Sequence, residues 1–263
     1  MPELPDVEIF KRYIDATSLH KKIDEVEVRA KDILEGVSSR TLKKALQGHS
    51  FERTARHGKQ LFVAIKDGDW LTMHFGMTGD LKYFKNMDDD TPHDRMLISF
   101  SNGYHLAYDN QRKLGAIGLV KDVNTFIQDH DLGPDALEDT LDFEAFQEAV
   151  AGGRATIKSA LMNQQRIAGI GNVYSDEILF QAGIRPDITT DDLDRDHLRH
   201  IYRSMKHVLR TAIERQADPD QMPKSWIIPH RRGDRVCPKC GGDIKDIRVS
   251  GRTAYYCPED QKK

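Results

Sequence analysis

The hydrophobic pattern of the first part of the chain changes from helical to strand-like. Leu4, Val7, Phe10 and Ile14 recur at the spacing of one helix face, and a proline is tolerated in a first helical turn. The segment IDEVEVRA then alternates apolar and charged residues. Further segments rich in β-branched and aromatic residues follow: QLFVAI, WLTMHF, LKYF, RMLISF and YHLAY.

Turn signals separate several of these segments. Residues 66–69 (KDGD) and 101–103 (SNG) both contain dipeptides that favour hairpin turns. The pattern up to about residue 124 therefore predicts an antiparallel sandwich or barrel with one leading helix.

The second part of the chain opens with an acidic stretch. Between Asp129 and Glu148 there are eight acids and no Lys or Arg, which we interpret as a linker and a solvated helix turned away from any polyanion. Helical patterns follow in ATIKSALMNQ, NVYSDEILFQAG and LRHIYRSMKHVLRTAIERQ, and ADPDQMPK interrupts them. From Ser225 the tail becomes basic, with Arg231, Arg232, Arg235, Lys239, Lys245, Arg248, Arg252, Lys262 and Lys263.

The length and the net charge of the chain limit the number of domains and the kind of nucleic-acid site that we expect. A chain of 263 residues favours two domains over one. Its net charge of -3 gives no general argument for nucleic-acid binding, so such a site would have to be a local patch. We expect neither a transmembrane helix nor a signal segment, because there is no long apolar run.

The three cysteines point to a metal. Cys237 and Cys240 have C-x-x-C spacing, and Cys257 follows after sixteen residues, which is typical of a zinc ribbon on a β-hairpin in a reducing compartment. Asp260 stands where a fourth cysteine belongs, and a carboxylate can bind zinc. His230 is a rival fourth ligand, and a metal-free fold held by packing is the alternative.

Two glycine-containing turns are candidate phosphate sites. Ser250 and Gly251 predict a hairpin tip carrying Arg252, whose guanidinium suits a phosphate, although a solvated arginine is the simpler interpretation. In RIAGIGNVYSDEILFQAGIRP, the glycines permit close approach of a ligand, and Asn172 is placed to cap the following helix. A helix start of this kind binds anions, so phosphate is the expected guest.

Three further loops hold residues that are ordinary when taken singly. RHGKQLF places Lys59 in a turn between strands, HFGMTG places Met77 in a loop, and DNQRKLG places Arg112 and Leu114 in a third. The simple interpretations are a solvated lysine, a core methionine, a surface arginine and a packed leucine.

Together these segments resemble the formamidopyrimidine-DNA glycosylase and endonuclease VIII family. The resemblance covers nearly the whole chain, in order: PELPDVE, HGKQL, HFGMTG, DNQRKLG, GIGNVYSDEILF and the terminal CPKC and GRTAYYCP. It implies an α+β multidomain fold: an N-terminal β-sandwich with a leading helix, and a C-terminal helix-two-turn-helix domain with a zinc-ribbon β-hairpin. The implied domains are 1–124 catalytic, 125–150 linker and first helix, 151–224 helix-two-turn-helix and 225–263 zinc hairpin.

The resemblance also implies an enzyme that excises oxidised bases and then cuts the strand by β,δ-elimination. Met1 would be removed, which exposes Pro2 as a secondary amine that attacks C1′ and forms an iminium. An α-amino group has a pKa near 8, so roughly a tenth of it is unprotonated at pH 7. Glu3 would be the general acid/base, and Lys59 would contact the backbone at the lesion and assist the chemistry.

Other residues would hold the DNA. By the same resemblance, Lys158, Asn172 and Arg252 would grip phosphates around the flipped nucleotide. Met77, Arg112 and Leu114 would fill the hole that the extruded base leaves.

The chain departs from the family pattern in several places. Asp6 stands where a glutamate is usual, and Leu114 replaces a commoner aromatic wedge. The segment QADPDQMPKSWIIPHRRGDR looks shorter than in members that excise 8-oxoguanine, which tilts the expectation toward other lesions. The missing fourth cysteine is a further difference.

Three alternatives remain open at this point: a protein that binds damage without cutting, a lyase restricted to abasic sites, and a plain zinc-ribbon nucleic-acid binder. The expected partners are double-stranded DNA with oxidised bases or abasic sites and one structural Zn²⁺. We expect a monomer that does not bind membranes and is cytoplasmic, associated with the nucleoid through DNA.

Overall fold

The computed structural model describes residues 1–151, 153–231 and 235–262. The chain divides into two compact units, one comprising Met1–Pro2 with Asp6–His130 and the other comprising Glu3–Pro5 with Asp131–Lys263. The four domain limits expected from the sequence stay predictions. None of the described helices is both long enough and apolar enough to cross a membrane.

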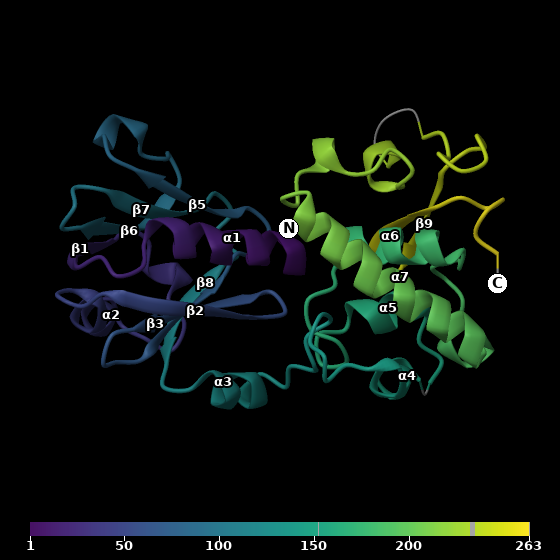
Figure 1. Cartoon of the computed structure of the whole chain (residues 1–263), viewed down its shortest axis with the longest axis horizontal. Coiled ribbons are helices and arrows are strands. Elements are labelled where there is room, and N and C mark those ends of the chain that lie inside the picture. Colours follow the sequence, from purple (N-terminus) through teal and green to yellow (C-terminus); the bar gives the residue numbers. More distant parts are fainter. Residues whose placement is uncertain (152, 232–234, 263) are drawn as a thin grey trace. The chain divides into compact units, whose positions relative to one another are not determined.

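Two four-stranded antiparallel sheets build the first unit (Figure 1). The strand orders are β1-β6-β7-β5 and β2-β3-β4-β8. The strands are β1 Ile23–Val28, β2 Phe51–His57, β3 Gln60–Ile65, β4 Trp70–His74, β5 Gly79–Phe84, β6 Asp94–Phe100, β7 His105–Asn110 and β8 Ala116–Val120.

Both sheets of the first unit contribute to one hydrophobic core. Ile98 from one sheet and Val63 from the other belong to the same cluster of buried side chains, which also includes Val7 and Ile14 from the leading helix. The predicted sandwich with a leading helix is therefore confirmed. The helices before residue 131 are α1 Leu4–Thr17, η1 Lys31–Ile33, α2 Ser39–Leu46, η2 Met87–Asp89 and α3 Val123–Asp129.

The predicted hairpin turns are also confirmed. Residues 66–69 join β3 to β4, which pair antiparallel, and residues 101–104 join β6 to β7 in the same way. The sequence pattern missed β2, α2 and β8. Strands β2 and β8 are the edges of their sheet, and β2 carries charged residues that an edge strand can leave in water.

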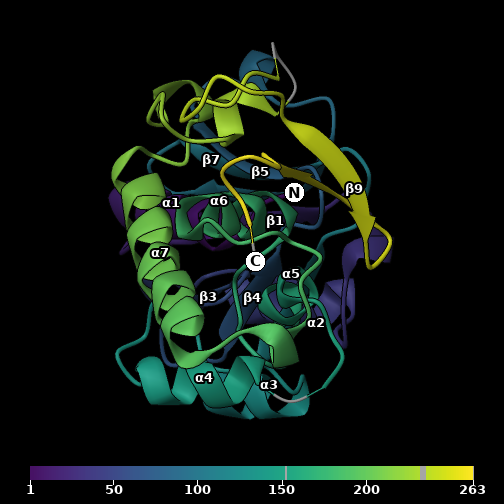
Figure 2. The same ribbon diagram turned by 90° about the vertical axis from the view of Figure 1, so that its right-hand side faces the viewer.

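Helices and one hairpin build the second unit. They are α4 Phe143–Val150, α5 Ile157–Met162, α6 Asn172–Ala182, η3 Thr190–Asp192, α7 Arg195–Glu214, η4 Pro219–Gln221, η5 Ile228–His230, β9 Lys245–Val249 and β10 Arg252–Tyr256. Helix α6 packs against α5, α7 and β10, and Figure 2 shows it between α7 and the hairpin. Gly183 caps the C-terminal end of α6 and adopts a left-handed conformation with φ of 73°.

The acidic stretch is less solvated than we expected. Asp142 caps α4 by accepting a hydrogen bond from the backbone N–H of Ala145, and Phe146 and Val150 of this helix are fully buried. The prediction of a solvated helix is therefore wrong for one face, because consecutive turns of α4 each supply an apolar side chain to the core. Whether its acidic face avoids a polyanion stays a prediction.

Candidate active site and metal centre

The residue after Pro2 is held by the start of helix α6. Glu3 is 1% exposed, and its carboxylate accepts hydrogen bonds from the backbone N–H groups of Gly171, Val173 and Tyr174 at 2.7, 2.8 and 3.3 Å. The N–H of Leu4 donates to the carbonyl oxygen of Gly169 at 3.0 Å. Backbone donors and helix dipole both favour a carboxylate at this position.

Two glycines make this approach possible. A Cβ on Gly171 would lie 2.4 Å from the carboxyl carbon of Glu3, and a Cβ on Gly169 would lie 2.6 Å from Leu4 Cδ1. The prediction that these glycines admit a close neighbour is confirmed, and phosphate binding at this helix start stays a prediction. The chain's own Glu3 carboxylate accepts hydrogen bonds from the backbone N–H groups at this helix start.

Asn172 has a different place from the one we expected. Gly171 is the N-cap residue of α6, no side-chain cap bond is present, and Asn172 is the first helical residue. The prediction that Asn172 caps the helix is therefore wrong, because the Glu3 carboxylate already takes the backbone donors. The side-chain oxygen Oδ1 of Asn172 is buried and has no hydrogen-bond partner among the described residues.

Lys158 is fully buried, and its expected contact with a phosphate stays a prediction. Its Nζ donates to Asp176 Oδ1 at 2.6 Å, to Ser175 Oγ at 2.8 Å and to the carbonyl oxygen of Asn172 at 3.1 Å. Burial lowers the pKa of Lys158, and the charge of Asp176 opposes that shift. All three donors of the ammonium therefore have partners inside the protein.

Arg252 occupies the expected hairpin tip. Ser250 and Gly251 form the turn between β9 and β10 with φ values of 48° and 76°. Arg252 is the first residue of β10 and is exposed. Of the basic tail, Arg232 and Lys263 lie outside the described residues.

In the first unit, Lys59 lies in the predicted turn. Gly58 and Lys59 connect β2 to β3. The neighbouring Arg56 donates to the carbonyl oxygen of Gly58 at 3.3 Å and to Glu8 Oε2 at 3.1 Å, which fixes the base of the turn. Burial, and then the charge of Lys59, lower the pKa of His74. Asp6 lies in the first turn of α1.

The loops that carry Met77, Arg112 and Leu114 contact each other. The guanidinium Nη1 of Arg112 lies 3.1 Å from Met77 Sδ. A Cβ on Gly76 would lie 2.4 Å from the backbone of Leu114. Met77 is 38% exposed and Leu114 is 51% exposed, so the interpretations as a core methionine and a packed leucine are wrong.

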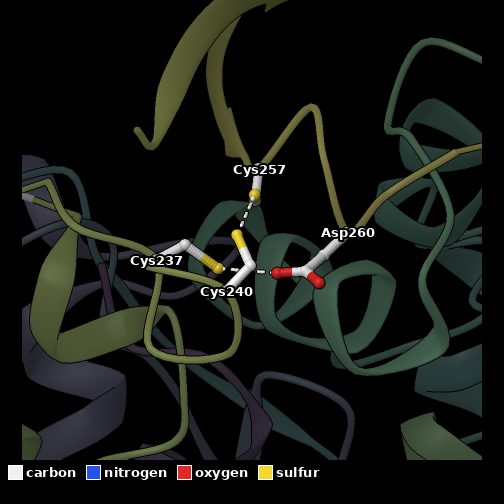
Figure 3. Close-up of side chains that lie close together, drawn as sticks. All are labelled: Cys237, Cys240, Cys257 and Asp260. Carbon is white, nitrogen blue, oxygen red and sulfur yellow. Dashed lines mark hydrogen bonds between the residues drawn. The ribbon is translucent and has the colours of Figure 1, made fainter. Parts of the chain in front are cut away.

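The predicted metal ligands converge (Figure 3). One ligand atom each of Cys237, Cys240, Cys257 and Asp260 lies within 4.8 Å of all the others. Cys237 Sγ is 2.8 Å from Asp260 Oδ2, and Cys240 Sγ is 3.5 Å from Cys257 Sγ. Four ligands on a zinc ion with bonds of roughly 2.0–2.3 Å need separations of this order.

Asp260 and not His230 completes this set. His230 Nε2 lies 3.1 Å from the carbonyl oxygen of Lys224, and the histidine is not part of the cluster. The hydrogen bond from Cys237 lowers the pKa of Asp260, which favours the anionic form that binds metal. The three thiols and the carboxylate fit one structural zinc.

Comparison with known proteins agrees with this geometry. Three family profiles match: the formamidopyrimidine-DNA glycosylase N-terminal domain over residues 1–117, the H2TH domain of the same enzymes over 132–222, and a zinc finger found in FPG and IleRS over 236–263. A formamidopyrimidine-DNA glycosylase of Geobacter metallireducens is 32% identical and covers 99% of this chain and 100% of its own. This chain belongs to the formamidopyrimidine-DNA glycosylase family. It is thus a member of a family of DNA-repair enzymes.

Other relatives of the formamidopyrimidine-DNA glycosylase family extend the comparison. The Arabidopsis thaliana enzyme is 30% identical over 100% of this chain and 71% of its own. Crystal structures of the Lactococcus lactis enzyme resemble this fold. One complex with abasic-site DNA has a TM-score of 0.90 and one with Fapy-dG DNA has a TM-score of 0.91, each at 27% identity and covering 99% of this chain and 100% of that chain.

Sequence reasoning missed several buried polar residues of this family member. Asp176 and Glu177 are both fully buried in α6, and Arg231 pairs with Asp176 at 2.9 Å. Two consecutive acids stand in the middle of α6, a helix with many apolar residues. Acids in such a helix are buried only when they have partners, so this pair could have indicated a buried polar network.

Proposed function

We propose that this protein is a bifunctional DNA glycosylase and abasic-site lyase that uses Pro2 as its nucleophile. The observation that carries the proposal is the fixed carboxylate of Glu3, which follows Pro2 directly and is held by three backbone N–H groups. A carboxylate restrained in this way next to a secondary amine is suited to proton transfer to and from the sugar that the amine attacks.

The chemistry runs through a covalent intermediate. After loss of Met1, the lone pair of the Pro2 nitrogen forms a bond to C1′, the C1′–N bond to the damaged base breaks, and the base leaves with a proton. Glu3 would then pass a proton to the ring oxygen O4′, the C1′–O4′ bond breaks and opens the sugar, and the nitrogen lone pair forms the C1′=N⁺ iminium. Because this nitrogen has no proton to lose, the iminium keeps its charge and acidifies C2′. Removal of a C2′ proton expels the 3′ phosphate, a second elimination expels the 5′ phosphate, and water releases Pro2. Glu3 would exchange protons with the sugar during these steps.

The remaining residues would bind DNA. Asn172 and Arg252 in the second unit and Lys59 in the first would contact phosphates, which position the duplex without reading its sequence. The exposed loop residues Met77, Arg112 and Leu114 would fill the space left by the extruded nucleotide. We propose that the protein acts as a monomer on double-stranded DNA at the nucleoid, with its zinc in a structural role.

Borohydride trapping tests this function. The purified protein is reduced in the presence of duplexes carrying an abasic site, 8-oxoguanine, formamidopyrimidine or thymine glycol. We expect a covalent adduct that is lost in Pro2→Thr, with mass spectrometry confirming that Met1 is removed. The matched control is Pro5→Thr, which changes a nearby proline but leaves the amine intact.

The outcomes separate the alternatives. Trapping on damaged bases supports the glycosylase and shows which lesions it removes. Trapping on the abasic duplex alone would leave a lyase. No trapping, with Met1 absent, would sink the catalytic proposal and leave a damage-binding protein.

A further inference from the structure

One buried carboxylate joins three parts of the second unit. Asp176 lies in α6 and has no exposed surface. It accepts hydrogen bonds or ion pairs from Lys158 Nζ at 2.6 Å, from Arg231 Nη2 at 2.9 Å and from the backbone N–H of Tyr255 at 3.2 Å. These donors come from α5, from the residue after η5 and from strand β10.

On one side, this network holds the backbone carbonyl of Asn172 and the side chain of Ser175 in the first turn of α6. The same Lys158 ammonium that binds Asp176 also donates to the carbonyl oxygen of Asn172 at 3.1 Å and to Ser175 Oγ at 2.8 Å. Asn172 lies four residues before Asp176, on the same side of the helix. The backbone of the proposed phosphate-binding Asn172 is therefore held through Lys158 and Asp176.

On the other side, the network fixes the zinc hairpin. Tyr255 is three residues after Arg252 and two before the metal ligand Cys257. The two-stranded hairpin leaves some backbone N–H groups of β10 without a partner strand, and Asp176 supplies an acceptor for one of them. The Arg231 guanidinium also lies over the Tyr255 ring, 4.8 Å from its centroid.

The direct contacts of this network hold more positive than negative charge. Lys158 and Arg231 supply two positive charges and Asp176 one negative charge, and the Glu3 carboxylate also acts on Lys158. Burial raises the pKa of Asp176, and the charges of Lys158 and Arg231 oppose that shift. A buried ion network adds little net stability compared with apolar packing. Its consequence here is that Asp176 holds α5, Arg231 and strand β10 in fixed positions around α6.

We infer that Asp176 is a positioning residue that sets Arg252 of the zinc hairpin relative to Asn172, so that both contact phosphates of one DNA strand. This inference rests on the proposed function. Asp176 does not touch DNA itself. We expect its effect on binding rather than on the chemical step, because Asp176→Asn keeps the backbone N–H groups of Gly171, Val173 and Tyr174 that hold Glu3.

The test measures DNA binding as a function of salt. We use the zinc-loaded full chain and a duplex with a tetrahydrofuran abasic analogue, which cannot be trapped covalently. Each phosphate contact contributes about 0.9 to the slope of log K against log salt, so the slope counts contacts. We expect Asp176→Asn to weaken binding about tenfold and to lower the slope by about one contact.

A second readout separates positioning from chemistry. At saturating abasic DNA, we expect the borohydride trapping rate of Asp176→Asn to stay within about twofold of wild type, whereas the DNA concentration for half-saturation rises. The loss in Asp176→Asn should also not add to the loss in Arg252→Ala, because both remove the same contact.

Two further variants keep the test decisive. The double variant Asp176→Asn/Lys158→Met removes one buried cation together with the anion. It is measured in place of Asp176→Asn if that single variant does not fold. Asp246→Asn is the matched control, because this aspartate is on the same hairpin in an exposed ion pair with Arg235 and should leave the slope unchanged.

Each result has one meaning. Wild-type slope and affinity in both Asp176 variants, or strict additivity with Arg252→Ala, would overturn the inference and leave the proposed function standing. A wild-type protein that binds the abasic duplex no better than undamaged DNA would overturn the proposed function, and this inference with it.

Discussion

The carboxylate of Glu3 accepts a 2.7 Å hydrogen bond from the backbone N–H of Gly171, which lies 168 positions later in the chain. This contact places the residue next to Pro2 at the start of helix α6. It makes Gly171 a residue on which the orientation of Glu3 depends.

We therefore expect Gly171→Ala to disable the chemistry without unfolding the protein. The added Cβ would lie 2.4 Å from the Glu3 carboxyl carbon, so the carboxylate must move. A displacement of this kind can lower the rate about 100-fold. Single-turnover trapping on abasic DNA measures the rate, and thermal unfolding checks the fold. Gly68→Ala is the control, because its Cβ makes only ordinary contacts of 3.5 Å or more. Equal trapping rates in the two variants would contradict the role of Glu3.

Glu177 should make the second unit less stable as the pH rises. Burial raises the pKa of Glu177 from its ordinary value of 4.5 to about 7, and hydrogen bonds from Gln181 and Ile228 oppose this only in part. Because the folded state holds the proton more tightly, stability is greatest at low pH and falls between pH 4.5 and 7. The fall is on the order of 3 kcal/mol at most.

Chemical denaturation at several pH values measures this effect. Glu177→Gln keeps an acceptor for the Ile228 N–H and should remove that part of the pH dependence, which makes the variant more stable than wild type at pH 8. The exposed Glu148→Gln is the control and should follow the wild-type curve. A Glu177→Gln variant that is less stable than wild type at pH 8 would contradict the prediction.

Asp260 should matter for zinc retention. Asp260→Ala removes one of the four ligands and should lower zinc affinity by more than about tenfold. Loss of a residue that only hydrogen-bonds to a metal ligand already lowers metal affinity by about tenfold or more. Asp260→Cys should hold zinc against a chelator at least as well as wild type. Metal analysis and release into a zinc-sensitive dye give both numbers. His230→Ala is the control, and loss of zinc in that variant instead would identify histidine as the ligand.

Leu114 should contribute to flipping but not to stability. Its side chain is 51% exposed, so Leu114→Ala should change the free energy of unfolding by no more than about 0.5 kcal/mol. If the side chain is buried in DNA, its loss should slow excision of a damaged base about tenfold. Abasic DNA has no base to extrude, so trapping on it should change less. Met87→Ala is the control, because Met87 is another exposed hydrophobic side chain of similar size. Equal excision rates in the two variants would remove Leu114 from the proposed wedge.

The sequence predicted those features that depend on local pattern. Alternating and helical hydrophobic periods correspond to β3, β4, β6 and β7 and to α6 and α7. The C-x-x-C spacing located the metal ligands. Strands β2 and β8 were missed and the acidic stretch was misjudged, because their burial depends on partners that a local window does not contain.

The sequence by itself determined the family, the order of its motifs and the types of residue available for chemistry, since these are written in short segments. Tertiary structure decided which of those residues are used. It placed the Glu3 carboxylate at the start of α6, buried Lys158 against Asp176, and brought Asp260 rather than His230 to the three cysteines. These choices join positions far apart in the chain, and only the folded backbone brings a buried charge to the donors that can stabilise it.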